Sequence, residues 1–269
     1  MDKKELNELL ESLHNKYNNL DFIECDPISI PHSFSSDKNI EISGFFAATI
    51  AWGNRKAIVK SAMRMMEYMD NQPYDFVFSA SENELRQLSS YVYRTFNGSD
   101  FICFVRALRN LCKNYGSLGN FFEQEYFLTQ DIRVVLSRFR TRFFETPHEK
   151  HCEKHLSSID RGAACKRLNM YLRWMVRSDN RGVDFGLWKK IPMSALYLPL
   201  DIHSGNMGRE FGLLARKQND WKAVEEITQN LREFDAADPV RFDFALFGAG
   251  INNVYGKLLG LSESLTVLY

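Results

Sequence analysis

Apolar residues along the chain recur at helical rather than alternating spacing, and short runs containing Gly, Pro, Asn or Asp interrupt them. This pattern predicts an all-α protein. Capping signals support it: Asn54, Asp201 and the pair Asp238-Pro239 each stand where a helix is expected to begin. The expected helices lie near residues 3–17, 38–51, 55–70, 82–90, 100–115, 118–126, 130–144, 162–178, 202–211, 220–233 and 240–250.

The polar segment 145–161, ETPHEKHCEKHLSSIDR, is the best candidate for a connection between two helical lobes. We expect residues 1–44 together with 161–269 to form one lobe and residues 45–160 to form the other, with a cleft between them in one compact protein. A chain of 269 residues with 45% hydrophobic and 25% charged residues has the length and balance of an ordinary globular protein.

The overall charge gives no argument for a nucleic-acid partner, because 34 basic residues balance 34 acidic ones. Any such argument has to come from local clusters. The chain begins with a charged amphipathic segment and contains no apolar run of about 18 residues, so we expect a cytoplasmic protein. Its five cysteines form no CxxC pair, and their odd number favours reduced thiols.

The segment 161–177, RGAACKRLNMYLRWMVR, is basic and contains no acidic residue. On a helix, Lys166, Arg173 and Arg177 fall on one stripe, with Met170 and Trp174 beside it. A cationic stripe with apolar and aromatic neighbours suits a phosphate backbone and an unstacked base. The alternative is a solvated basic helix face. The basic residues of this segment are Arg161, Lys166, Arg167, Arg173 and Arg177.

Lys166 is the candidate nucleophile. It is expected one turn inside the helix, where the positive end of the helix dipole and nearby arginines disfavour the ammonium form. An amine nucleophile needs such activation.

Asp201, in the stretch Leu198-Pro199-Leu200-Asp201-Ile202-His203, is the candidate carboxylate partner. An aspartate before a helix is usually a cap that contributes about 1 kcal/mol. A capping carboxylate is also rigidly aimed, and as an anion it could stabilise positive charge developing on a sugar. His203 is close enough to line the same pocket, although an orienting or purely structural role for it stays open.

Three segments resemble the helix-hairpin-helix DNA glycosylases. PLDIHSGNMGREFGL is similar to their P-V-D-x-H-V-x-R-V-x-x-R-L-G-L segment, whose aspartate is catalytic and corresponds to Asp201. EISGFFAATIAWGNRKAIVKSA resembles their early E-L-L-I-A-V-L-L-S-x-Q-x-T helix, turn and next helix. DFALFGAG is similar to their A-L-I-L-H-G-R helix. CKRLNMYLRWMVR, with PLDIH and DFALF, also resembles a bacterial family of unassigned function.

The departures from the glycosylase pattern are specific. Members with a catalytic lysine place it after a hairpin of L-P-G-V-G type, whereas here Gly162 alone precedes Lys166, so the hairpin is expected to be degenerate or absent. The archaeal 8-oxoguanine DNA glycosylases also carry an atypical hairpin and use a lysine and an aspartate, which makes them the nearest functional analogy. No cysteine follows Cys165, so we expect no iron–sulfur cluster.

The turn 51–56, AWGNRK, corresponds to the place where these enzymes fill the gap left by a flipped base. Trp52 is therefore expected to stack on a base and Asn54 to hydrogen-bond the orphaned partner base. Arg55, Lys56 and Lys60 are expected to meet phosphates, as are Arg167, Arg173 and Arg177. The base-pocket candidates are Trp52, Asn54, Met170, Trp174 and His203. For Trp52, a core tryptophan before a helix start is the alternative.

The resemblance implies a fold of the helical DNA-glycosylase type and a base-excision repair glycosylase with AP lyase activity. It would act through a Schiff base at Lys166 with Asp201 as partner, on an oxidised purine such as 8-oxoguanine. The expected partner is double-stranded DNA with a damaged base, bound by a monomer at the bacterial nucleoid, with no membrane and no cofactor. Two alternatives stay open: a non-catalytic nucleic-acid-binding protein of the same fold, and a helical protein whose basic helix meets an acidic partner.

A last group, His148, His151, Cys152 and His155, has spacing that can meet a metal ion. Acidic residues and lysines interleave with these residues, and the sequence shows no second ligand cluster. We therefore interpret the segment as a polar connector and expect no metal.

Overall fold

The computed structural model describes residues 1–251, and the all-α prediction is confirmed. Each helix expected from the apolar spacing is present. The long helices are α1 (Lys3–Tyr17), α4 (Asp37–Thr49), α5 (Arg55–Tyr68), α8 (Gly98–Tyr115), α9 (Leu118–Thr129), α10 (Ile132–Phe143), α11 (Lys166–Val176), α12 (Ile202–Glu210), α13 (Trp221–Arg232) and α14 (Asp243–Ile251).

The shorter elements were mostly unforeseen, because a single turn carries too little periodicity to be recognised. They are α2 (Asp21–Glu24), α3 (Ser29–His32), α6 (Pro73–Ser79), α7 (Glu82–Gln87), the hairpin of β1 (Val92–Tyr93) and β2 (Phe96–Asn97), and the 3-10 turns η1 (Leu88–Ser90), η2 (Lys150–His155), η3 (Ile159–Arg161), η4 (Met193–Ala195) and η5 (Pro239–Phe242). Of these, α7 and η1 lie within the helix predicted at 82–90, and η5 overlaps the start of the helix predicted at 240–250.

The chain divides into two compact units. Unit 1 comprises Met1–Phe22, Arg161–Gly186 and the described part of the segment that begins at Pro192, and unit 2 comprises Ile23–Asp160 and Leu187–Ile191. We expected residues 23–44 in the same lobe as the C-terminal segment, but they belong to unit 2. The reason is that α4, apolar over most of its circumference, packs against α3, α5 and α6.

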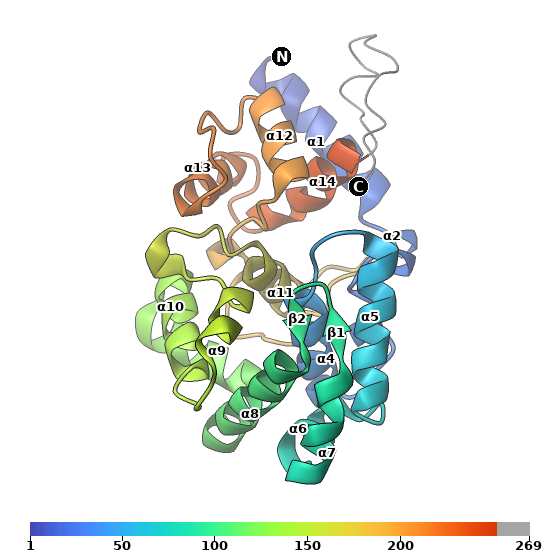
Figure 1. Ribbon diagram of the computed structural model, residues 1–269. Helices are drawn as coiled ribbons and strands as arrows, with labels where there is room; N and C mark the ends of the chain where they lie inside the picture. Colours follow the sequence, from blue (N-terminus) through green and yellow to red (C-terminus); the bar gives the residue numbers. More distant parts are fainter. Residues whose placement is uncertain (252–269) are drawn as a thin grey trace. The chain divides into compact units, whose positions relative to one another are not determined.

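In unit 1, α14 packs against both α1 and α12, and Figure 1 shows these three helices together. The contact between α1 and α14 is close because Gly248 has no side chain. A Cβ at this position would lie 2.3 Å from the Tyr17 ring. The packing of α14 therefore positions the start of this helix, at Asp243, against the rest of the unit.

In unit 2, the helices α8, α9 and α10 (Figure 1) pack on one another. The core that they enclose is rich in phenylalanine. The short return segment Leu187–Ile191 inserts Trp188 into this unit. The Trp188 ring stacks on Phe122 at 4.9 Å, and its Nε1 donates a hydrogen bond of 2.8 Å to Glu41 Oε1. Burial raises the pKa of Glu41. The hydrogen bonds from Trp188 Nε1 and Gly119 N oppose this rise and satisfy the carboxyl group inside the core.

Among the described helices, none combines the length and the apolar character that crossing a membrane requires.

Candidate active site

Lys166 and Asp201 lie together in unit 1. Lys166 is the first residue of α11, Asp201 is the N-cap of α12, and Lys166 Nζ is 3.9 Å from Asp201 Oδ2. Both side chains are partly accessible, with 28% and 21% of their surfaces exposed. The two helix starts therefore bring an amine and a carboxylate into one solvent-accessible place.

The local structure of α12 fixes the direction of Asp201. Its Oδ1 accepts hydrogen bonds from the Ser204 backbone N at 2.9 Å and from Ser204 Oγ at 3.2 Å, while its own backbone N donates to Ser204 Oγ at 2.9 Å. This reciprocal capping arrangement holds one carboxylate oxygen on the helix end. The other oxygen, Oδ2, is the one that faces Lys166.

The start of α11 differs from the expectation. We expected the helix from residue 162 with Lys166 one turn inside, but the helix begins at Lys166 itself. The cause is Cys165, which has φ 48° and adopts the left-handed conformation, so helical hydrogen bonding cannot extend further back. The Trp221 backbone N donates a hydrogen bond of 2.9 Å to Gly162 O and holds the segment 162–165 that leads into α11.

The segment that precedes α11 contains the 3-10 turns η2 and η3, and no α-helix occurs between α10 and α11. This arrangement accords with the expectation that a regular hairpin before the lysine is degenerate or absent.

Asp243, which sequence reasoning did not select, lies within electrostatic reach of the Lys166–Asp201 pair. It is the first residue of α14 and is 6% exposed, and it accepts a hydrogen bond from Arg173. Burial raises the pKa of Asp243 to about 6, while the positive charge of Arg173 opposes the rise and Asp201 adds to it. The available signal was its place at the start of the DFALFGAG segment, which resembles a glycosylase helix.

The expected basic stripe on α11 is wrong for Arg173 and Arg177, because both side chains are buried in ion pairs. Arg173 lies 3.2 Å from Asp184 and also pairs with Asp243. Arg177 lies 2.9 Å from Asp179, 3.1 Å from Asp184 and 2.8 Å from Asp238. Burial alone would lower the pKa of Arg177, but these carboxylates raise it. Neither guanidinium is available to a DNA phosphate.

The Asp238-Pro239 signal is also only partly right. These residues start the 3-10 turn η5, and α14 begins later, at Asp243. The Asp238 side chain makes no capping hydrogen bond and instead pairs with Arg177.

Met170 and Trp174, the expected apolar and aromatic neighbours of the basic stripe, are buried in the core of unit 1. Trp174 is 0% exposed and Met170 is 7% exposed, so neither ring nor thioether offers a surface on which a base could stack. The prediction of these two residues as base-pocket groups is therefore wrong. Arg167 is half-buried, and burial lowers its pKa to about 10, which leaves the guanidinium charged at neutral pH. Its assignment to a phosphate stays a prediction.

His203 follows Asp201 on the first turn of α12 and is exposed. Its ring meets Phe247 edge to face at 6.1 Å. His203 thus lies two residues from Asp201 with an accessible imidazole, and its place in a base pocket stays a prediction.

The turn 51–56 lies in unit 2. Trp52 is half-buried, and its ring stacks with His155 at 5.9 Å. Asn54 caps α5 by accepting a hydrogen bond of 3.2 Å from Ala57 N, as its place before the helix predicts. Arg55 pairs with Asp26 at 3.3 Å, whereas Lys56 and Lys60 are exposed one turn apart on α5. An exposed basic face is therefore present on α5, although α11 lacks the expected one.

Comparison with known families gives one match. The model of the family described as "Protein of unknown function (DUF2400)" covers residues 26–252. The chain belongs to the DUF2400 family. A search of curated proteins and a search of solved structures found no match.

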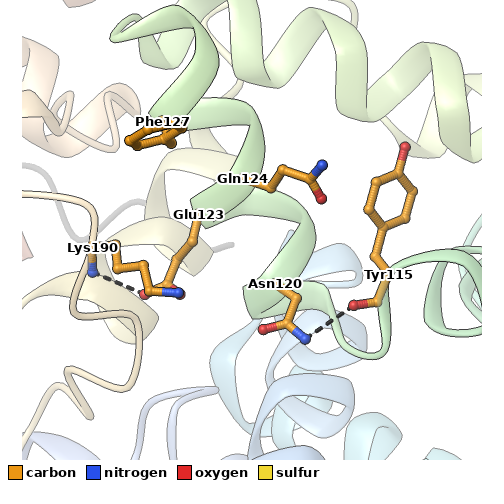
Figure 2. Close-up of a pocket in the computed structure, with 6 residues that line it drawn as sticks. All are labelled: Tyr115, Asn120, Glu123, Gln124, Phe127 and Lys190. Atoms are coloured by element: carbon orange, nitrogen blue, oxygen red, sulfur yellow. Dashed lines mark hydrogen bonds and ion pairs between the residues drawn. The ribbon is translucent and has the colours of Figure 1, made fainter.

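The DUF2400 region also contains a surface hollow in unit 2, of about 510 Å³. Its two charged side chains pair with each other, since Lys190 Nζ lies 3.5 Å from Glu123 Oε2 (Figure 2). The Asn120 side chain donates a hydrogen bond of 3.0 Å to Tyr115 O. With these groups paired, the hollow offers no reactive group comparable with Lys166. Its lining residues are Tyr115, Asn120, Glu123, Gln124, Phe127 and Lys190.

Proposed function

We propose that this DUF2400 protein is a DNA base-excision glycosylase with AP lyase activity, and that its substrate is duplex DNA carrying an oxidised purine such as 8-oxoguanine. The observation that carries the proposal is the approach of Lys166 Nζ to Asp201 Oδ2 at 3.9 Å. The two residues are 35 positions apart in the sequence, and the resemblance to the glycosylases gives them different chemical roles in one reaction. The lesion class rests on the analogy with lysine-bearing 8-oxoguanine glycosylases.

The first step requires a neutral amine at Lys166. The Asp201 carboxylate is a nearby proton acceptor, and a water molecule or a small rotation of the lysine side chain bridges the 3.9 Å that separate the two groups. The amine then attacks C1′ of the flipped nucleotide, and the bond from C1′ to the base nitrogen breaks. The departing base takes the electron pair of that bond and a proton. Positive charge develops on the sugar during this step, where Asp201 as an anion stabilises it.

The second step opens the sugar. The nitrogen lone pair of Lys166 forms a double bond to C1′ as the C1′–O4′ bond breaks, and O4′ takes the electron pair of that bond and a proton, which leaves a protonated Schiff base and a hydroxyl group. Loss of a proton from C2′ then expels the 3′ phosphate, and the strand is cut. Hydrolysis of the Schiff base returns the lysine, so the protein needs no redox partner for this sequence.

Arg173 and Asp243 support this site from inside unit 1. Arg173 holds Asp243 at the start of α14, and Asp243 in turn adds negative potential around Lys166 and Asp201. Because Asp243 is buried, its interaction with charges nearby is stronger than it would be in water. Asp243 acts here as a positioning and electrostatic residue rather than as a group that touches the substrate.

DNA binding rests on exposed basic side chains. Lys56 and Lys60 on α5 supply one such face, and Arg167, which is half-buried next to Lys166, is a further candidate cation. Trp52 is the candidate for stacking at the lesion, and Asn54 the candidate for the orphaned base.

Borohydride trapping tests the proposal. Borohydride reduces a Schiff base to a stable amine, so the wild-type protein should form a covalent complex with duplex DNA containing 8-oxoguanine or an abasic site. Lys166→Gln should abolish the complex because it removes the reacting nitrogen. Lys222→Gln, at an exposed position on α13, is the matched control and should trap as well as wild type.

Trapping that persists in Lys166→Gln would overturn the assignment of the nucleophile. Tight DNA binding without trapping on either substrate would replace the enzyme by a non-catalytic nucleic-acid-binding protein of the same fold.

A further inference from the structure

Asp100, His151 and Cys152 form a compact group in unit 2 that the proposed chemistry does not use. Asp100 lies in the first turn of α8, and the other two residues lie in η2. One ligand-type atom from each residue, an oxygen, a nitrogen and a sulfur, lies within 4.8 Å of the other two. Two segments far apart in the sequence thus bring three different metal-binding atoms together.

The Asp100 carboxylate is 0% exposed, and its two oxygens face different partners. Its Oδ2 accepts hydrogen bonds from Asn97 N at 2.9 Å and from His155 Nε2 at 3.1 Å. Its Oδ1 accepts no well-aligned hydrogen bond from the described residues but lies 3.1 Å from His151 Nε2, and the Cys152 thiol also interacts with the carboxylate. A buried carboxylate oxygen that faces an imidazole nitrogen and a thiol has the surroundings of a metal ligand.

Two of the separations among the three atoms are close to those around a tetrahedral cation. His151 Nε2 lies 3.1 Å from Asp100 Oδ1 and 3.8 Å from Cys152 Sγ. Zinc bonds of the usual lengths at tetrahedral angles place nitrogen and oxygen ligands about 3.3 Å apart, and nitrogen and sulfur ligands about 3.6 Å apart.

The imidazole of His151 is also oriented for a metal. Its Nδ1 lies 3.2 Å from Glu149 Oε2, and Ser99 Oγ lies 3.2 Å from its Nε2. When Nδ1–H donates to Glu149, Nε2 carries a lone pair that can accept from the serine or bind a cation. A carboxylate behind a metal-binding histidine is the usual arrangement around zinc.

We propose that Asp100 Oδ1, His151 Nε2 and Cys152 Sγ bind a divalent transition-metal ion of the zinc class. A thiolate and an imidazole favour zinc over magnesium or calcium, which prefer oxygen ligands. Water takes the fourth position, because 35% of the His151 side chain is exposed and solvent reaches the group there.

Binding exchanges a proton for the metal at the thiol. The incoming cation bonds to the Cys152 sulfur, and the thiol proton leaves to solvent.

A metal here would tie η2 to the start of α8. His155, also in η2, holds Asp100 Oδ2 and stacks on the ring of Trp52. The ion would therefore stabilise the position of His155, and through it that of Trp52 in the turn 51–56. This role is structural and does not depend on the glycosylase proposal.

The test uses the full-length protein, treated with a chelator, kept reduced and titrated with zinc in a calorimeter. We expect about one equivalent bound per chain. Cys152→Ser and His151→Gln should each weaken zinc binding by about 100-fold or more, because each removes a direct ligand. Matched controls are Cys25→Ser, an exposed thiol in the same unit, and His148→Gln, a neighbouring imidazole outside the group, and both should bind zinc as wild type does.

Cobalt binding gives a second measurement, and its main result comes from the wild-type protein alone. Wild-type protein loaded with Co²⁺ should show the thiolate-to-cobalt charge-transfer band, and Cys152→Ser should lack it. Absence of the band in wild type would overturn the site. Zinc binding that is equally tight in wild type and in both ligand variants would overturn it as well.

Discussion

Asp243 and Arg173 form a buried ion pair in which Arg173 donates a hydrogen bond to the carboxylate, and this pair lies within electrostatic reach of Lys166 and Asp201. Lys166 and Asp201 are thus the accessible edge of a larger charged cluster. Four carboxylates surround the guanidinium groups of Arg173 and Arg177. They belong to Asp179, Asp184, Asp238 and Asp243. In the proposed reaction, an excess of negative charge inside unit 1 would stabilise the positive charge that develops on the sugar.

The first prediction concerns the pH dependence of trapping. Burial raises the pKa of Asp243 to about 6, so the carboxyl group is neutral below that pH and negative above it. The ionised form stabilises positive charge developing on the sugar, and the rate of borohydride trapping should therefore rise as pH increases through about 6. Asp243→Asn stays neutral at every pH and should lose this inflection, which single-turnover trapping at a series of pH values would measure.

An inflection that persists in Asp243→Asn would assign the titration to another group. Circular dichroism of the variant would show whether unit 1 still folds without the buried charge.

The second prediction separates capping from chemistry at Asp201. Asparagine caps helices about as well as aspartate, so Asp201→Asn should change the free energy of unfolding by less than about 1 kcal/mol. It removes the negative charge that faces Lys166, and trapping should fall by about 100-fold or more. Chemical denaturation and trapping of the same preparation give both values.

The matched control is Asp220→Asn at the N-cap of α13, where the carboxylate accepts from Ala223 N at 3.1 Å. It should trap as wild type does. Equal trapping by Asp201→Asn and wild type would show that Asp201 is only a cap.

The third prediction concerns Arg177, which is 1% exposed among three carboxylates. Arg177→Met leaves those carboxylates buried without their partner, and the free energy of unfolding should fall by about 3–5 kcal/mol. Arg142→Met breaks a surface pair with Glu145 and should leave the free energy of unfolding almost unchanged. Urea denaturation compares them, and similar losses in the two variants would contradict a structural role for the cluster.

The sequence predicted the helical framework well because local rules determine it. The helix expected at 55–70 is observed at Arg55–Tyr68, and Asn54 and Asp201 cap the helices that follow them. Apolar spacing and capping chemistry act within a few residues, so one chain contains the information.

Long-range pairing was not predictable in this way. The stripe on α11 looked like a phosphate-binding face because its partners, among them Asp184, Asp238 and Asp243, lie elsewhere in the chain. A basic stripe has the same spacing whether water or buried carboxylates neutralise it. The histidine segment was interpreted as a polar connector for the same reason, since Asp100, which completes the proposed metal group, lies in α8.

The fourth prediction concerns the exposed lysines of α5. Each phosphate contact releases counterions, so the logarithm of DNA affinity falls with the logarithm of salt concentration. Lys60→Ala should reduce this slope by about 1 and weaken binding to any DNA sequence. Lys3→Ala, at an exposed lysine that pairs with Glu233 in unit 1, should leave the slope unchanged. Fluorescence anisotropy at several salt concentrations gives the slopes, and an unaltered slope in Lys60→Ala would remove α5 from the DNA-binding surface.

The fifth prediction concerns acid stability and depends on His14, which is 4% exposed in α1. Burial lowers the pKa of His14 to about 4, and the charges of nearby arginines add to the effect. The neutral ring fits its surroundings: Nδ1 donates to Arg241 O at 2.9 Å, and Nε2 lies 3.4 Å from Asn18 Nδ2, which can donate to it. A proton on Nε2 would face that amide donor.

The folded and unfolded chains bind a proton on His14 at different pH. The unfolded chain takes up a proton on His14 near pH 6.5, and the folded chain does so only near pH 4, so stability is fully present above pH 6.5 and is lost as pH falls toward 4. A shift of this size corresponds to about 3 kcal/mol. Between pH 7 and pH 4, wild type should therefore lose about 3 kcal/mol more than His14→Gln in urea denaturation, whatever the other titrating groups contribute. His203→Gln, at an exposed histidine, should follow wild type, and parallel pH curves for wild type and His14→Gln would contradict the assignment.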